Sequence, residues 1–241
     1  MNIKLSVIVP CYNEERRFQR GFEHYYSYLK RQKYSWELIL VNDGSCDKTL
    51  QLMQKVARAR PQIKVLTHSP NRGKGFAIVV GVRASKGQYI LFTDIDHSVP
   101  IETIETFYDY FDNGYSVVIG SRRVYGAKIM IRQNLLRESM GRVFTLLVRF
   151  FINWEIRDAT CGFKAFERKV AKKLFQKLLI YDWAFDAEIL YLCKKYQIKL
   201  AQAPVRWSDV RGTKVSLKRD VLRSFVGLLK IQLNDFQKLY Q

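Results

Sequence analysis

Asp94 and Asp96 are the residues whose type and spacing point most directly to chemistry. They flank a single isoleucine at the end of the apolar run 89–93. Residues two apart on an extended strand point to the same side, so these carboxylates can share one cation. A hard divalent ion held there would bridge the phosphates of a nucleotide and offset the charge on a leaving diphosphate. Taken alone, this spacing is more often a pair of solvated or capping aspartates.

Two further clusters could contact a nucleotide. Asp43 follows the predicted strand 37–41 and could accept hydrogen bonds from a base or a ribose, although an Asx-turn or helix cap explains it equally well. The glycines of segment 73–75 would let the backbone approach a phosphate, and Lys74 between them supplies a point charge. Gly-Lys-Gly is often only a turn. The segment lacks the spacing of a Walker loop, which argues against an ATPase.

The elements that must position these clusters alternate between strands and helices. Apolar, β-branched runs predict four buried strands, at 5–10, 37–41, 63–66 and 89–93. Helical spacing between them predicts a parallel sheet with right-handed crossovers. Ligands bind beyond the carboxyl ends of such strands. Four polar clusters follow those ends and should converge on one rim: 12–14, 43–44, 73–75 and 94–96.

Composition limits the function classes without choosing among them. The 241 residues suit one α/β domain, alone or with a terminal appendage, and the 48% of hydrophobic residues argue against disorder. Lysine and arginine number 41 against 22 acidic residues, a net charge of +19 that attracts nucleic acid, anionic lipid or phosphorylated substrates. The four cysteines form no C-x-x-C pair, so we expect neither a zinc site nor a disulfide framework, and a reducing compartment.

No segment of the sequence predicts a membrane-spanning helix. The first residues run directly into a strand, which does not fit a signal peptide. The longest apolar segment, 143–152, is broken by Arg149 and is far shorter than the roughly 20 residues a span requires.

The C-terminal tail from Val215 predicts a basic amphipathic helix. Its apolar residues cover one arc with basic residues at the border: Val221, Phe225, Leu228, Leu229, Phe236, Leu239, Arg219, Arg223 and Lys230. Such a helix is typical of a membrane interface, and an ordinary core-packing helix fits the pattern equally well. We therefore expect a catalytic domain at 1–214 and an interfacial helix at 215–241. The aromatic and arginine-rich stretch 131–154 is the alternative membrane contact.

The order of these motifs resembles glycosyltransferase family 2. Four segments of the first half carry the resemblance: 5–15, 41–45, 71–75 and 93–96. Later segments resemble its dolichyl-phosphate glucosyltransferase and mannosyltransferase branch: 120–122, 157–166, 183–188, 204–207 and 212–214. The resemblance covers roughly residues 3–217. Segments 73–75 and 161–164 favour the glucosyltransferases, whose eukaryotic members carry an N-terminal anchor; the residues of this sequence do not predict one. His97-Ser98-Val99 also departs from the Leu-Gln continuation of the mannosyltransferases.

This resemblance implies a GT-A fold, an α/β architecture with a Rossmann-like, mostly parallel sheet between helices. It implies an inverting transfer of a hexose, with glucose favoured, from a UDP-sugar rather than a GDP-sugar. Donor contacts are expected from Pro10, Tyr12, Asn13, Glu14, Asp43, Gly73, Lys74 and Asp94. Mg²⁺ or Mn²⁺ is expected on Asp94 and Asp96. The residues expected to be catalytic are Asp96, Arg122 and Lys214.

The acceptor implied by the resemblance is a polyprenyl or dolichyl phosphate. Its phosphate is already ionised, so no general base is needed. Cations must instead hold it beside the donor diphosphate, and the candidates are Arg122, Arg132, Arg137, Arg211 and Lys214. Glu188 is expected to orient such basic residues. We expect a peripheral enzyme on the cytoplasmic face of a membrane, and a membrane protein is a possible partner.

Two other functions remain open from the residues alone. A non-catalytic nucleic-acid-binding domain would use the basic surface, but paired rim aspartates repel a phosphate backbone, so no nucleic acid is expected. A family 2 transferase with a saccharide or protein acceptor would need a base carboxylate, for which the candidates are Asp182, Asp186 and Glu188.

Overall fold

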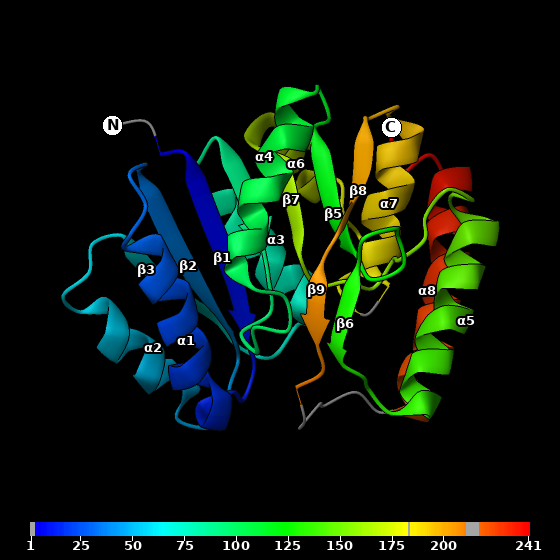
Figure 1. The fold of residues 1–241 in the computed structure, drawn as a ribbon. Helices are drawn as coiled ribbons and strands as arrows, with labels where there is room; N and C mark the ends of the chain where they lie inside the picture. The colour runs from blue at the N-terminus through cyan, green and yellow to red at the C-terminus, as the bar shows by residue number, and fades with distance from the viewer. Residues whose placement is uncertain (1–2, 183, 211–216) are drawn as a thin grey trace.

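The four strands predicted in the first hundred residues form neighbouring strands of one sheet. The computed structural model describes residues 3–182, 184–210 and 217–241 (Figure 1). The strands are β1 (Leu5–Cys11), β2 (Trp36–Asp43), β3 (Ile63–His68) and β4 (Tyr89–Phe92). β1 pairs in parallel with β2 and β4, and β2 pairs in parallel with β3. The predicted parallel sheet is confirmed, and the carboxyl ends of these strands lie on one edge.

The second half of the chain extends the same sheet. Its strands are β5 (Val117–Ser121), β7 (Lys164–Glu167) and β8 (Leu200–Pro204). The order across the sheet is β3-β2-β1-β4-β7-β5-β8, with β7 antiparallel to both of its neighbours. A separate pair, β6 (Lys128–Ile131) with β9 (Arg206–Ser208), lies in front of it (Figure 1). β7 thereby brings a segment of the second half directly beside β4.

Helices cover both faces of the sheet. On one face lie α1 (Glu15–Leu29), α2 (Thr49–Ala57) and α4 (Ile104–Asp112), which follows the short 3₁₀ turn Ile101–Thr103. On the other lie α3 (Lys74–Ala84), α6 (Arg168–Gln176) and α7 (Phe185–Lys195). The alternation of side chains along β1 explains the two cores: Ile8 packs on one face, whereas Val7 and Val9 pack on the other.

Two long helices, α5 (Leu135–Phe151) and α8 (Leu217–Phe236), lie side by side beyond α7 (Figure 1). On α8, Leu228 and Ile231 are fully buried in the core. Gly227 permits this close approach, since a Cβ there would lie 2.2 Å from Cβ of Ala184. The predicted boundary between residues 214 and 215 lies outside the described residues.

The opposite side of α5 and α8 is apolar and exposed. On α5 and just beyond it these residues are Leu135, Leu136, Val143, Leu146, Phe150 and Trp154. On α8 and just beyond it they are Phe225, Val226, Leu229, Leu233, Phe236 and Leu239. Among the described residues, no helix has the length and apolar content to cross a membrane. We call these twelve residues the apolar face.

Candidate active site

The predicted carboxylate pair lies directly beyond β4, next to the N-terminus of α3. Nζ of Lys74 lies 2.5 Å from Oδ1 of Asp94. Burial works against the positive charge of Lys74, but the carboxylates of Asp94 and Asp186 outweigh it and raise the pKa of Lys74. The expected convergence of segments 73–75 and 94–96 is therefore present, as an ion pair.

Asp96 shares this environment with Asp94. Its Oδ1 accepts a hydrogen bond from the backbone N–H of Ser98, at 3.0 Å. Burial raises the pKa of Asp96, and the negative charge of Asp94 raises it further, against the opposing effects of Ser98 and Arg17. Two carboxylates that disfavour each other's charge gain from a shared cation.

The donor atoms of this pair fit a magnesium or manganese ion. Hard divalent cations prefer carboxylate oxygens and take about six ligands. Asp94 and Asp96 supply too few for a complete shell, and within the described residues no group of three or more acidic, histidine or cysteine side chains is placed to hold an ion. The residues present therefore fit an ion whose remaining ligands come from a nucleotide diphosphate and water.

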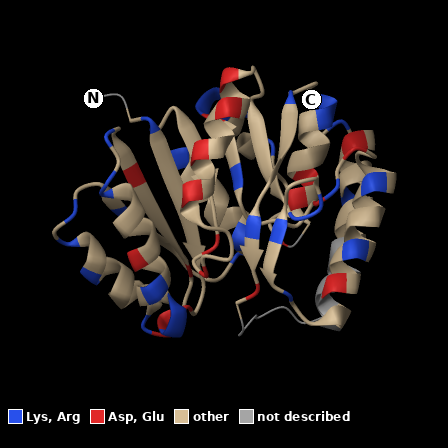
Figure 2. Cartoon of the chain, viewed as in Figure 1, with Lys and Arg blue, Asp and Glu red and all other residues tan. Residues whose placement is uncertain are grey.

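A segment from the second half of the chain closes over the pair. A Cβ on Gly162 would lie 2.1 Å from Oδ2 of Asp94, so any larger residue at position 162 would displace the Asp94 carboxylate. The neighbouring Lys164 is fully buried, and its Nζ donates to Oδ1 of Asp186 at 2.5 Å and to the carbonyl of Cys161 at 2.8 Å. Segment 161–164 is thereby fixed between β4 and α7. Figure 2 shows acidic and basic residues meeting below the ends of the central strands.

Asp43 organises the loop that precedes α3. Its Oδ1 lies 2.7 Å from Nε2 of His68 and accepts from the backbone N–H of Arg72, whereas its Oδ2 accepts from the side chain of Asn71 and the backbone N–H of Gly73. Both oxygens are thus engaged with the protein. The geometry gives Asp43 a positioning role toward the Gly73–Lys74 turn, and a direct contact with the donor stays a prediction.

The loop after β1 is tied to the loop after β2. Asn13 has a positive φ of 52°, and its side-chain oxygen accepts from the backbone N–H of Cys46 at 2.7 Å. Glu14 accepts two hydrogen bonds from the guanidinium of Arg17, at 2.8 and 2.7 Å. The ring of Tyr12 lies at the surface of the same rim, and Pro10 is half-buried on β1. The contacts of these four residues with a donor remain predictions.

Arg122 is held by a carboxylate that is buried completely. Its Nε and Nη2 donate to the two oxygens of Asp158, at 2.7 and 2.8 Å, and its backbone N–H donates to the same group at 3.0 Å. Burial alone would raise the pKa of Asp158, but Arg122 lowers it to about 2. The guanidinium also lies 5.3 Å from the ring centre of Trp207. Arg122 is therefore a fixed cation whose charge is shared with Asp158.

The other predicted acceptor cations are only partly described. Arg132 is exposed and lines a pocket of about 200 Å³ together with Arg122, Arg123, Ile129, Gln133, Glu138, Arg142 and Trp207. Arg137 belongs to α5, and its side chain is outside the described part of the chain. Arg211 and Lys214 also lie outside the described residues. We call this pocket the Trp207 pocket.

Comparison of the sequence with protein families identifies the family of the chain. Residues 6–175 match the family described as glycosyl transferase family 2. The chain belongs to glycosyltransferase family 2.

Curated relatives of this family 2 glycosyltransferase are similar over most of their length. The dolichyl-phosphate beta-glucosyltransferase of Dictyostelium discoideum is 33% identical, over 96% of this chain and 78% of the relative. The human protein of the same name is 34% identical, over 88% of this chain and 69% of the human protein. That of Saccharomyces cerevisiae is 31% identical, over 99% and 77%.

Solved structures confirm the GT-A fold of the family 2 enzyme. The glucosyl-3-phosphoglycerate synthase of Mycobacterium tuberculosis, crystallised with Mn²⁺, UDP-glucose and phosphoglyceric acid, superposes with a TM-score of 0.66. The superposition covers 95% of this chain and 79% of the synthase chain, and the two sequences are 18% identical. A second crystal of that synthase contains Mg²⁺ and UDP, with a TM-score of 0.65. Crystals of that synthase therefore contain a divalent metal together with a uridine nucleotide.

Within the described part of this family 2 glycosyltransferase, Glu188 contacts no basic side chain, whereas the sequence suggested that it orients basic residues. It is fully buried and accepts from the backbone N–H groups of Leu179 and Ile180 and from the hydroxyl of Tyr240. Its partners among the described residues are thus all neutral. Asp186, the second carboxylate considered as a base, is neutralised by Lys164. Neither is presented to an acceptor as a free carboxylate.

A change of Glu188 to glutamine should alter the pH dependence of stability. Burial raises the pKa of Glu188 to about 7, above its ordinary 4.5, against the hydrogen bonds that lower it. The native state then keeps a proton that the unfolded state loses, so stability should fall by about 3 kcal/mol as pH rises from 4.5 to 7 and stay level above. Glu188→Gln should remove this fall in urea unfolding between pH 5 and 8. Exposed Glu23→Gln is the control, and an unchanged profile in Glu188→Gln would contradict the raised pKa.

The sequence assigned no role to Asp158, Lys164 or His68, which the structure places around the site. Asp158 and Lys164 lie inside the motif 157–166, but a buried charge cannot be recognised from its residue type. His68 ends β3, and its Nδ1 is a buried atom without a hydrogen-bond partner among the described residues. Its position at a strand end was the available signal.

Proposed function

We propose that this family 2 glycosyltransferase transfers glucose from UDP-glucose to a polyprenyl phosphate of the dolichyl class. The observation that carries the proposal is the 30–34% identity to dolichyl-phosphate beta-glucosyltransferases over 88–99% of the chain. The ion pair of Lys74 with Asp94, next to Asp96, supports it because a nucleotide diphosphate needs both a cation and metal-binding carboxylates.

Donor binding would use the rim at the carboxyl ends of β1, β2 and β4. Asp94 and Asp96 would hold Mg²⁺ or Mn²⁺, which when bound offsets the charge of the leaving diphosphate. Lys74 would place its ammonium group beside the same phosphates. Asp43 keeps the backbone of Gly73 in position through its hydrogen bond to the N–H, at 3.1 Å.

Acceptor binding would use the Trp207 pocket. A phosphate monoester is ionised at neutral pH, so its oxygen can attack the anomeric carbon directly. The bond from that carbon to the diphosphate oxygen breaks, UDP leaves and the anomeric configuration inverts. The requirement is then a set of cations that hold two anions close together. Arg122, fixed by Asp158, and exposed Arg132 supply such charge, together with the predicted Arg137, Arg211 and Lys214. Ile129 and Trp207 offer apolar contacts for the first isoprene units.

Access to a lipid acceptor would come through the apolar face. Its residues are exposed although they are large and apolar, among them Phe150 at 76% and Phe236 at 86%. Monomeric soluble proteins rarely expose contiguous apolar patches of this kind, and basic amphipathic helices bind membrane interfaces. The inner side of α8 packs on the core, and its outer side would lie on the cytoplasmic surface of a membrane.

Two glutamates on α8 should separate membrane binding from donor binding. Leu229→Glu with Leu233→Glu is expected to weaken binding to vesicles and to lower transfer to long-chain acceptors, because both side chains are about half exposed on the apolar face. Affinity for UDP should not change. The matched control is Gln51→Glu with Gln54→Glu, which adds two charges at exposed positions of α2. Equal vesicle binding by both variants would place the membrane contact elsewhere.

The function itself is tested by product formation. The protein is incubated with radiolabelled UDP-glucose, Mg²⁺ and a polyprenyl phosphate, and organic extracts are examined for lipid-linked glucose. GDP-mannose is the donor control, and a polyprenol without phosphate is the acceptor control. We expect lipid-linked glucose only with UDP-glucose and the phosphate. Labelled saccharide or protein without lipid-linked product would instead favour a transferase with a different acceptor.

A further inference from the structure

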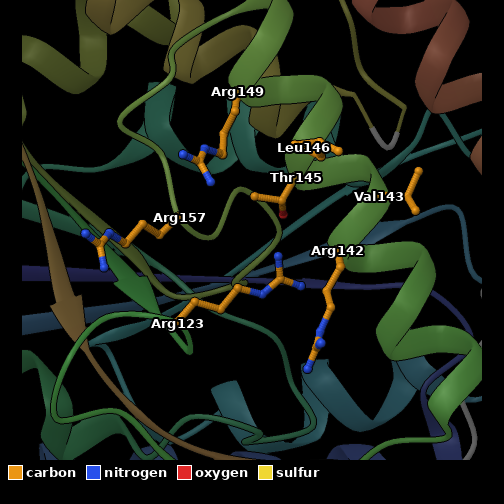
Figure 3. A pocket seen from close by; sticks show the side chains of 7 residues that line it. All are labelled: Arg123, Arg142, Val143, Thr145, Leu146, Arg149 and Arg157. Carbon is orange, nitrogen blue, oxygen red and sulfur yellow. The ribbon is translucent and has the colours of Figure 1, made fainter.

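A second basic hollow lies next to the Trp207 pocket, along α5. It has a volume of about 600 Å³ and is lined by Arg123, Arg142, Val143, Thr145, Leu146, Arg149 and Arg157 (Figure 3). Arg142, Thr145 and Arg149 come from α5, and Arg123 and Arg157 come from loops that face it (Figure 3). Ligand sites in proteins are typically about 300–1,000 Å³, so the hollow is large enough for a polar lipid headgroup. We call it the arginine hollow.

The charge in the arginine hollow is strongly unbalanced. Its lining contains four arginines and no acidic residue. Arg142 is paired with Glu138 on α5, but within the described residues no carboxylate lies at ion-pair distance from Arg123 or Arg157. Figure 2 shows basic residues along α5. Clustered guanidinium groups of this kind are typical of sites that recognise phosphates.

The positive charge of Arg123 is disfavoured at this position. Burial lowers its pKa, and the positive charges of Arg122 and Arg142 lower it further, against the attraction of Asp158 and Glu138. Its guanidinium reaches α5 at Gly141, where a Cβ would lie 3.7 Å from Nη2. An anion between Arg123 and α5 would relieve this repulsion.

The hollow also contains an unused hydrogen-bond donor and a pre-oriented arginine. Thr145 is 97% buried, and its hydroxyl has no hydrogen-bond partner among the described residues. Buried polar groups nearly always have a partner, so this hydroxyl indicates a missing ligand or water. Arg149 is held by a 3.0 Å hydrogen bond from Nε to the carbonyl of Trp154, and its guanidinium lies 4.3 Å from the centre of that ring.

The rim of the arginine hollow is continuous with the apolar face. Val143 and Leu146 line the hollow and are more than half exposed, and Phe150 and Trp154 continue the exposed surface beyond them. A phosphate bound among the arginines would therefore have apolar side chains beside it. This combination matches a phospholipid, which carries an anionic headgroup and acyl chains on one molecule.

We propose that the arginine hollow binds the headgroup of an anionic membrane phospholipid. It would be a second lipid site, separate from the acceptor, because two of the predicted acceptor cations, Arg122 and Arg132, line the Trp207 pocket and neither lines the arginine hollow. Arg123 and Arg142 belong to both linings, so a bound phospholipid would also fix one wall of the Trp207 pocket. The inference goes beyond the proposed function, since it requires no transfer reaction.

Short-chain lipids, used below their micelle concentration, test the site on the full-length protein. The probes are dihexanoyl phosphatidylglycerol, dihexanoyl phosphatidylcholine and inorganic phosphate, with binding measured by calorimetry at physiological salt. Phosphatidylglycerol should bind most tightly, because the arginines repel the choline cation of phosphatidylcholine and inorganic phosphate lacks acyl chains. Arg149→Gln with Arg157→Gln should weaken it by about tenfold or more, through the loss of two charge-assisted contacts.

The control variant is Lys55→Gln with Arg58→Gln, which removes two exposed charges, one on α2 and one directly after it, at the far end of the molecule. It should bind phosphatidylglycerol with the affinity of the unmodified protein. Both variants should bind UDP with Mg²⁺ as the unmodified protein does. Equal weakening in the two variants would show only long-range attraction and would overturn the proposal. Equal affinities for inorganic phosphate and phosphatidylglycerol would also overturn the proposal. Displacement of phosphatidylglycerol by a short polyprenyl phosphate would overturn it too, because it would assign the hollow to the acceptor.

Discussion

Replacement of Asp96 by alanine is expected to reduce glucosyl transfer by about 10²–10³-fold or more, the scale on which a single group that stabilises transition-state charge contributes. The physical reason is its place beside Asp94 at the end of β4, where burial and then the negative charge of Asp94 raise the pKa of Asp96, so that a shared cation would stabilise its charged form. Without Asp96, the site keeps one carboxylate, and that carboxylate is paired with Lys74. Binding of UDP should then lose its dependence on Mg²⁺.

This result is measured by transfer assays and by calorimetry of UDP with and without Mg²⁺. Asp109→Ala, at an exposed position of α4, is the matched control and should keep full activity. Thermal unfolding should show that Asp96→Ala is folded. Full transfer by that variant, or by the unmodified protein in excess chelator, would end the metal hypothesis for this pair.

The Asp158→Ala variant is expected to be destabilised by about 3–5 kcal/mol, as happens when one partner of a buried ion pair is removed. Asp158 is fully buried and accepts from the Nε, the Nη2 and the backbone N–H of Arg122. Its loss leaves a guanidinium and an amide without their acceptor. The free energy of unfolding in urea measures the effect.

The same pair predicts an acid limb of stability. The native pKa of Asp158, about 2, is below its ordinary 3.8, so its contribution is present above about pH 4 and is lost as pH falls through 2. The shift corresponds to about 2 kcal/mol at neutral pH. Adding Arg122→Met to Asp158→Ala should recover part of the lost stability, because the uncompensated charge is then gone. No recovery would mean that the two residues are not energetically coupled.

The sequence by itself determined the four parallel strands of the first half of the chain and the composition of the rim, whereas β5, β7 and β8 were not predicted. Strands such as Leu5–Cys11 and Trp36–Asp43 contain the apolar runs 7–9 and 38–41, and such runs predict strands that are covered on both faces. Once strands and helices alternate, handedness and the common edge of the strand ends follow. The meeting of segments 73–75 and 94–96 could thus be predicted because it depends on local pattern and topology.

The tertiary structure alone decided which charges pair and which are buried. Arg122 bonds Asp158 across 36 positions, and Tyr240 bonds Glu188 across 52. The sequence offered Arg122 as a cation for the acceptor and Glu188 as a partner for basic residues, because residue type does not reveal burial. The amphipathic pattern of α8 likewise showed one apolar arc, whereas the fold divides its apolar residues between buried Leu228 and Ile231 and the exposed apolar face.

The physical reason is common to these cases. Hydrophobic periodicity is a local property, and it acts within a few residues of each position. Ion pairs such as Lys164 with Asp186, and the arginine hollow beneath α5, form only when distant segments are packed together and their charges lose water. The desolvation that selects these partners depends on the complete arrangement of neighbours in the folded chain.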